Sequence, residues 1–335
     1  MPNTCKKQWL EKHTGLVYRD SVKLIEQKVK GSQKTTCEFD TRFVDMGGAN
    51  NLGMLCHHLI GDVEPLFATK LESCRLAERE YFFLKWQQET QIEEEWVAAD
   101  IVCCTHLGSS DICGLTMEYL HTPKVHDDQG VIDLYRRMGK LTKYLSSMPN
   151  AIQHENLIEI PLEANTKITR TIKYIVTQLH HPDAYQVAKE FMEKRKSVFS
   201  GWEREYQKIV QFISDSAFLS EDFNFDQHYG LLHGDFKKDN ILSDCKGRLK
   251  VIDLQYYSYG ARLWDMAFLC SKEKEWFGGI HNKFIRPLAL SPTEYRIFVL
   301  LFVLADLLHV RKSNVKRKLT MHVLPALSSV ATYGE

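Results

Sequence analysis

Three polar residues, His233, Asp235 and Asn240, lie in the segment LLHGDFKKDNIL, which begins and ends with an apolar pair. If these pairs are strand ends, the polar residues form an exposed loop, and loops on rigid elements often carry chemistry. A turn at residues 245–247 and the segment RLKVID follow, ending at Asp253. The pattern predicts a short hairpin whose open ends bring Asn240 and Asp253 together, with Asp235 beside them.

Converging carboxylate and amide oxygens suit Mg²⁺, which takes one or two carboxylates and completes its octahedron with water and phosphate oxygens. We expect Asn240 and Asp253 to bind the metal. A nearby carboxylate that stays free of the metal can orient an attacking hydroxyl and accept its proton, a role that fits Asp235. The simpler interpretation is a capped turn with solvated polar residues, but the spacing His-x-Asp-x4-Asn before a hairpin-closing Asp favours catalysis.

The segments HGDFKKDN and VIDLQ resemble the catalytic and metal loops of the protein-kinase-like fold, in the small-molecule branch of aminoglycoside phosphotransferases and choline/ethanolamine kinases. The resemblance implies that Asp235 is the catalytic base and that Asn240 and Asp253 hold Mg²⁺. It also implies that His233 braces the loop. Gly234 replaces the Arg usual in protein kinases, which favours a small-molecule acceptor over a protein.

The same resemblance gives roles to three neighbouring residues. Lys237 matches a lysine of Ser/Thr protein kinases that contacts the transferred phosphate, where a cation neutralises developing charge. Lys238 is expected to be solvated. The segment LWDMAF resembles the Asp-Leu-Ala segment of these families, which implies that Asp265 accepts backbone hydrogen bonds from the catalytic loop.

The hydrophobic patterns predict an α+β fold with two lobes. Residues 1–34 form a helical lead-in. Residues 35–120 alternate as strands around one helix, which predicts a small antiparallel sheet, and the resemblance implies that this lobe binds nucleotide. Residues 121–335 are mostly helical and are assigned to catalysis and acceptor binding.

Lys70 is the candidate phosphate-binding cation of the first lobe. It shares a strand face with Leu66 and Ala68, so its ammonium should project from the inner face of the sheet. The helix that follows resembles the family's Glu-bearing helix, which implies that Glu80 pairs with Lys70 against the α and β phosphates. Glu78 is the second candidate partner.

Two weaker motifs complete the predicted nucleotide site. The turn MGGANNLG resembles the Gly-Gly-x-x-Asn turn of choline kinases, so Gly47 and Gly48 would let backbone amides approach phosphate, with Asn51 as the matching polar residue; a plain hairpin turn is the alternative. The segment MEYL lies at the predicted lobe boundary, where backbone groups of Glu118, Tyr119 and Leu120 would face adenine.

The acceptor is suggested by the aromatic segment IDLQYYSYGARLWDMAFL, which is similar to a choline-kinase segment bordering the substrate. Tyr256, Tyr259 and Trp264 could line a pocket for a quaternary ammonium group. Core packing beneath the loop is the alternative for these aromatic residues. Gln255 stands where that family usually has Glu, which weakens the case for a cationic acceptor.

Composition limits the remaining possibilities. Lys and Arg number 43 and so do Asp and Glu, so no net field favours nucleic acid or an anionic membrane. Nine cysteines are scattered without a Cys-x-x-Cys pair, which predicts buried, reduced thiols and a cytoplasmic location. The first residues lack a signal-peptide pattern, and the longest apolar run, 297–305, is too short to span a membrane.

These observations predict an ATP- and Mg²⁺-dependent phosphotransferase that acts on a small-molecule hydroxyl, with choline or ethanolamine as the first candidate acceptors. An aminoglycoside- or sugar-directed enzyme is an alternative within the same class. A nucleotide-binding pseudokinase that serves as an interaction module is an alternative outside it.

Overall fold

The computed structural model describes residues 8, 10–12, 14–44, 52–90, 97–123, 127–147, 167–216 and 229–333. Residues 1–124 and 242–255 form one compact unit, and residues 125–241 and 256–335 form a second. The assignment of residues 35–120 to nucleotide binding and 121–335 to catalysis stays a prediction.

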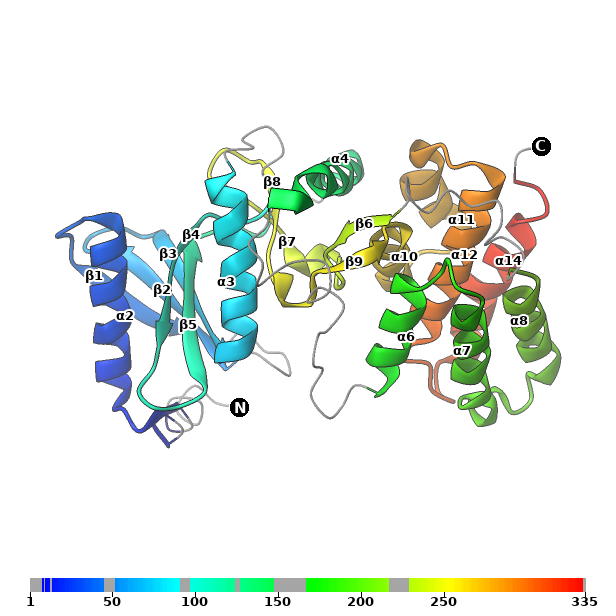
Figure 1. Ribbon diagram of the computed structural model, residues 1–335, viewed down its shortest axis with the longest axis horizontal. Helices are drawn as coiled ribbons and strands as arrows, with labels where there is room; N and C mark the ends of the chain where they lie inside the picture. The colour runs from blue at the N-terminus through cyan, green and yellow to red at the C-terminus, as the bar shows by residue number, and fades with distance from the viewer. Residues whose placement is uncertain are drawn as a thin grey trace. The chain divides into compact units, whose positions relative to one another are not determined.

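A five-stranded antiparallel sheet in the order β1-β2-β3-β5-β4 is the frame of the first unit (Figure 1). Its strands are β1 (Phe39–Val44), β2 (Gly53–Leu59), β3 (Pro65–Ser73), β4 (Ile101–His106) and β5 (Ile112–Glu118). The predicted small antiparallel sheet is therefore confirmed. The central strand β3, which carries Lys70, has a partner on each side.

Two helices, α2 (Tyr18–Gln33) and α3 (Cys74–Glu89), pack against this sheet. Apolar side chains of α2 and of the strands form a buried cluster that includes Ile25, Val29, Leu55, Leu71 and Ile112. Burying such side chains stabilises the unit by about 1.5–3 kcal/mol each. This cluster joins α2 to the strands. The other helix, α3, is the one that reaches Lys70.

A two-stranded hairpin, β7 (Ile241–Ser243) and β8 (Leu249–Val251), follows the candidate catalytic loop. Single bridges join it to other segments of the first unit, between Ala98 and Val251 and between His121 and Ser243. These bridges fix the segment that leads to Asp253.

The second unit is mainly helical, with one small sheet of β6 (Tyr229–Leu232) and β9 (Ser258–Ala261). Its longer helices are α4 (Asp128–Lys140), α6 (Lys167–Thr177), α7 (Pro182–Glu193), α8 (Glu203–Ser216), α10 (Leu263–Lys272) and α12 (Pro292–Leu307). Shorter helices are α11 (Phe277–Ile280), α13 (Val315–Lys318) and α14 (Leu324–Ser329). The apolar run 297–305 lies inside α12, and every residue of this run is buried. Among the described residues, no helix has the length and apolar character needed to span a membrane.

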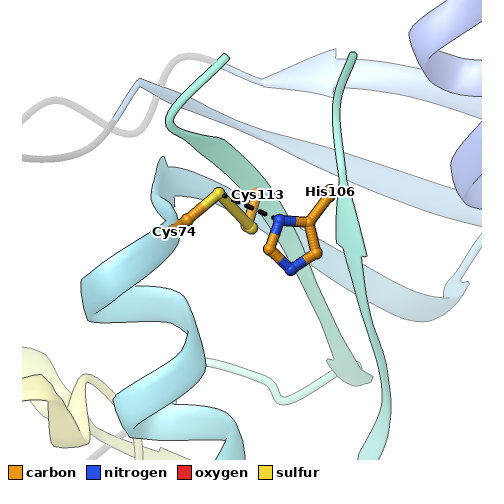
Figure 2. Close-up of side chains that lie close together, drawn as sticks. All are labelled: Cys74, His106 and Cys113. Carbon is orange, nitrogen blue, oxygen red and sulfur yellow. Dashed lines mark hydrogen bonds between the residues drawn. A yellow bond between two sulfur atoms is a disulfide. The ribbon is translucent and has the colours of Figure 1, made fainter. Parts of the chain in front are cut away.

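The expectation of reduced thiols is wrong at two positions, because Cys74 and Cys113 form a disulfide (Figure 2). The register of β3 and β5 places Ser73 opposite Ile112, so the first residue of α3 arrives beside Cys113. The two Cα atoms are 4.7 Å apart, a normal separation for a disulfide. Cys56, Cys103 and Cys270 keep buried free thiols, as expected, whereas the free thiols of Cys37 and Cys245 are exposed and the expectation of burial is wrong there.

Candidate active site

The first unit holds a cluster of four charged residues centred on Lys70. The Lys70 ammonium lies 3.0 Å from a carboxylate oxygen of Glu80, 3.0 Å from one of Glu72 and 2.5 Å from Oδ1 of Asp253. Strand β3 supplies Lys70 and Glu72, α3 supplies Glu80, and Asp253 follows β8. One cation thus lies among three carboxylates.

Electrostatics in this cluster follow from burial and from the surplus of acidic groups. Burial alone would lower the pKa of Lys70, but attraction by Glu80, Asp253 and Glu72 raises that pKa well above its ordinary value. Burial raises the pKa of Glu72 to about 8, with Glu80 adding to the effect and Lys70 opposing it. The cluster has more negative charge than one ammonium neutralises and can accept further positive charge.

Glu80 also connects Lys70 to the backbone that follows Asp253. One carboxylate oxygen accepts from the Lys70 ammonium, and the other accepts from the Leu254 N–H at 3.0 Å. The expected Lys70–Glu80 contact is therefore present. Glu78, the second candidate partner, lies instead 3.1 Å from Nε2 of His106.

The candidate catalytic loop in the second unit is anchored by Asp265. Its two carboxylate oxygens accept from the N–H groups of His233, at 2.7 Å, and Gly234, at 2.9 Å. Burial raises the pKa of Asp265, opposed by the charge of His233 and by these hydrogen bonds. The expectation that Asp265 accepts backbone hydrogen bonds from the loop is confirmed.

Gly234 has a physical reason to be glycine. Its φ is +85°, and a Cβ at this position would lie 2.4 Å from the backbone oxygen of Tyr256. The larger residue that protein kinases carry here would clash with this backbone. Steric exclusion therefore accounts for the departure seen in the sequence.

Asp235 is held by two residues that follow it closely. Lys237 donates from its ammonium to Oδ2 of Asp235 at 2.6 Å, and Asn240 donates from Nδ2 to the same oxygen at 3.1 Å. Asn240 also donates to the backbone oxygen of Asp235 at 2.9 Å. The N–H of Asp235 donates to Nδ1 of His233 at 3.3 Å, which fits a bracing role for that histidine. A fixed carboxylate with a neighbouring cation can position a hydroxyl and accept its proton.

The expectation of a solvated Lys238 is wrong. Its ammonium lies 2.9 Å from Glu273 and 3.7 Å from Asp128, and it lies over the ring of Phe284. These partners come from distant parts of the chain, so local spacing could not reveal them. Lys238 links the loop to other segments of the second unit, whereas Lys237 contacts Asp235.

The weaker nucleotide motifs have different outcomes. Gly47, Gly48 and Asn51 lie outside the described residues. In the boundary segment, Glu118 donates its N–H to Asp100 and Tyr119 donates its N–H to Leu66.

The carboxylate of Glu118 accepts from the N–H of Asp100 at 2.9 Å and pairs with the ammonium of Lys250. Leu120 is buried. A role in adenine binding stays a prediction for the carbonyl groups of this segment and for the Leu120 N–H.

The predicted acceptor residues differ in exposure. Gln255 and Trp264 are only 4% and 5% exposed, and the indole N–H of Trp264 donates to the backbone oxygen of Gly234 at 3.4 Å. Tyr256 and Tyr259 are partly exposed. Trp264 therefore supports the catalytic loop through this hydrogen bond. Acceptor binding by the four residues stays a prediction.

The second unit also contains a cavity of about 340 Å³ that no sequence pattern indicated. Its lining includes Trp276, His281, Tyr295, Ser329 and Tyr333. No carboxylate, Lys or Arg is part of the lining, so this cavity lacks the groups that phosphoryl transfer requires. The parallel rings of Tyr295 and Tyr333, 3.6 Å apart, make it an aromatic packing region.

Comparison with known proteins identifies the family of this chain. Residues 97–289, more than half of its length, match the model of the phosphotransferase enzyme family. The chain belongs to this family. The match includes the segment with Asp235, Asn240, Asp253 and Asp265, whose geometry is described above. No curated protein matches the chain.

Solved structures give the fold. A candidate fructosamine-3-kinase from Haemophilus somnus 129PT is 13% identical, with a TM-score of 0.52, and the match covers 93% of this chain and 98% of that one. Aminoglycoside phosphotransferase APH(4)-Ia is 12% identical (TM-score 0.49; 94% and 99% covered). Choline kinase from Cryptosporidium parvum Iowa II is 11% identical (TM-score 0.42; 92% and 90% covered). The predicted α+β, protein-kinase-like fold is confirmed, and membership of the family supports a phosphotransferase.

Proposed function

We propose that this protein is a kinase that transfers the γ-phosphate of ATP to a hydroxyl group of a small molecule, in the presence of Mg²⁺. The observation that carries the proposal is the Lys70 cluster. A buried ammonium among three carboxylates has an excess of negative charge. Such a cluster suits a dication and the phosphates that accompany it.

Lys70 would hold the α and β phosphates, and Glu80 would orient its ammonium through the 3.0 Å contact. Adenine would bind carbonyl groups of Glu118 to Leu120 and the Leu120 N–H, because the N–H groups of Glu118 and Tyr119 already have partners. Gly47, Gly48 and Asn51 keep their proposed place at the phosphates on sequence grounds.

We propose Asp253 and Asn240 as the protein ligands of Mg²⁺. The donor set fits this hard cation, because Asp253 offers a carboxylate with 24% of its side chain exposed. Asn240 contacts Asp235 through its amide nitrogen, so its side-chain oxygen is the atom suited to a metal. Mg²⁺ bound there would neutralise charge on the phosphates.

Asp235 would align the acceptor hydroxyl and take its proton as the oxygen attacks the γ-phosphorus. Lys237, 2.6 Å from Asp235, would then be placed to offset charge on the transferred phosphoryl group. Asp265 and His233 would act by holding the loop in this arrangement.

The acceptor is proposed from the aromatic residues around Tyr256 and Tyr259. An amino alcohol such as choline or ethanolamine is the first candidate. Aminoglycosides, sugars and fructosamines are the alternatives, and the last is supported by the name of one structural neighbour. A cytoplasmic location is part of the proposal, since ATP is supplied there.

ADP release, measured with Mg²⁺ and ATP or GTP against a panel of amino alcohols, aminoglycosides, sugars, fructosamines and nucleosides, tests the proposal. We expect release that depends on one acceptor class and exceeds the rate without acceptor at least tenfold. Binding of Mg-ATP by calorimetry without turnover of any acceptor would favour the pseudokinase alternative. Lack of both binding and turnover would contradict the proposal.

A further inference from the structure

Three side chains from three elements meet at the beginning of α3 (Figure 2). Cys74 is the first residue of α3, His106 ends β4 and Cys113 lies on β5, opposite His106 in the strand register. Nδ1 of His106 lies 3.4 Å from Sγ of Cys74, and Cys113 is fully buried. We propose that Cys74 and Cys113 form a reversible thiol–disulfide site, with Cys74 as the attacking thiol, that fastens α3 to the sheet.

Cys74 has the surroundings of a reactive thiol. A helix N-terminus and a neighbouring imidazole both favour a thiolate. His106 Nδ1 can accept the Cys74 proton, and Glu78 Oε1, 3.1 Å from Nε2, holds the ring on its other side. The His106 side chain is 60% exposed, so a small reagent can approach from this side.

Burial disfavours the thiolate at three other cysteines of the same unit. Burial raises the pKa of Cys56 and of Cys103. Burial, with a contribution from Glu78, raises the pKa of Cys104 to about 12. Cys104 is therefore a matched control, since it lies on the strand that carries His106.

The exchange balances with a small disulfide such as oxidised glutathione. The Cys74 thiolate attacks one glutathione sulfur, the glutathione S–S bond breaks, and a glutathione thiolate leaves. Cys113, as thiolate, then attacks Sγ of Cys74, and the second glutathione leaves. Two protein thiols and one glutathione disulfide give one protein disulfide and two glutathione thiols.

The site is connected to the Lys70 cluster through α3, a step that rests on the proposed function. Glu80 follows Cys74 by six residues, about 9 Å along the helix. The disulfide ties the first residue of α3 to β5, the neighbour of β3, while Glu80 contacts Lys70 on β3. The oxidised form thus has the Lys70–Glu80 pair assembled. Reduction leaves the Cys74 N–H bond to Asp111 as a backbone anchor of this end.

The three residues could also hold a metal ion, because their ligand atoms lie within 4.8 Å of one another. A metal would need both sulfurs as separate thiolates. The two sulfurs are bonded to each other, so the geometry assigns the cluster to disulfide chemistry.

The first experiment uses the full chain equilibrated with defined mixtures of reduced and oxidised glutathione, trapped with N-ethylmaleimide and analysed by mass spectrometry. We expect one cooperative transition to a Cys74–Cys113 disulfide. Cys113→Ser should accumulate glutathione on Cys74, Cys74→Ser should leave Cys113 unmodified, and Cys104→Ser should match the parent.

His106→Gln, in the Cys113→Ser background, should slow glutathione transfer to Cys74 and shift its pH dependence. Three results would overturn the site: no Cys74–Cys113 disulfide in any mixture, glutathione on Cys113 instead of Cys74, or one tightly held Zn²⁺ in the reduced chain that prevents oxidation.

The second experiment measures Mg-ADP affinity by calorimetry for the oxidised and the reduced parent, with Cys104→Ser as control. We expect reduction to weaken binding about fivefold, the lower end of common coupling between two sites. Equal affinities would overturn the link to α3. If neither form binds Mg-ADP, the proposed nucleotide function fails, while mass spectrometry still decides the thiol–disulfide site.

Discussion

The Lys70 cluster and the Asp235 loop balance charge in opposite ways. Lys70 is one cation in contact with three carboxylates, whereas Asp235 is one carboxylate in contact with one cation and one amide. The first arrangement leaves negative charge for added cations to neutralise. The second leaves a carboxylate that is already positioned, which suits a base more than a metal site.

The two regions also differ in how the chain builds them. Asp235 takes its side-chain partners from two and five residues away, so a tight loop suffices. Lys70 contacts Asp253, 183 residues away, and depends on the packing of a strand, a helix and a hairpin. We therefore expect substitutions at Asp235 to affect chemistry selectively and substitutions at Lys70 to affect both nucleotide binding and stability.

The largest effect is expected at Asp235. Asp235→Asn keeps a hydrogen-bond acceptor for Lys237 and Asn240 but removes the base. Turnover should therefore fall by about 10²–10⁴-fold, while Mg-ATP affinity stays near the parental value. Steady-state ADP release and calorimetry measure the two quantities. Asp239→Asn, an exposed neighbour, is the matched control. Parental turnover in Asp235→Asn would remove this residue from the chemistry.

Lys70→Met should have the next largest effect. It removes the cation that Glu72, Glu80 and Asp253 share, so we expect kcat/KM for ATP to fall by about 10²-fold. The midpoint temperature of thermal unfolding should also fall, because the buried carboxylates lose the Lys70 ammonium as their ion-pair partner.

The control is Lys85→Met. Lys85 makes an exposed ion pair with Glu89 at 3.6 Å. ATP-dependent kinetics and thermal unfolding are measured on the same preparations. An unchanged KM and kcat would show that Lys70 is only a structural cation.

The difference between the local partners of Asp235 and the distant partners of Lys70 also determines how much of each region the sequence could predict. The spacing of Asp235 and Asn240 lies within six residues, and the contact of Lys70 with Glu80 came from strand alternation plus a family resemblance. Glu72 was missed, although alternation puts it on the same strand face as Lys70 and could have found it.

The Cys74–Cys113 disulfide and the Lys238 ion pairs could not have been found from spacing. The disulfide depends on the register of β3 against β5, and Lys238 depends on two distant elements. Register and helix packing are set by tertiary contacts that no local pattern contains.

The smallest effect, and the most direct test of surplus charge at Lys70, is the pH dependence of stability at Glu72. Its pKa of about 8 in the folded protein is above the value of 4.5 for a free Glu side chain, so the folded state binds this proton more tightly. The resulting stability is present below about pH 4.5 and is lost as pH rises through 8. Glu72→Gln has no such proton, and the parent should lose on the order of 1–3 kcal/mol more than this variant between pH 6 and pH 9. Denaturant unfolding with EDTA at both pH values measures the difference, with the exposed Glu89→Gln as control. Equal losses of stability in the parent and in Glu72→Gln would mean that Lys70 neutralises Glu72 fully. The surplus of negative charge that distinguishes the Lys70 cluster from the Asp235 loop would then come from Glu80 and Asp253 alone.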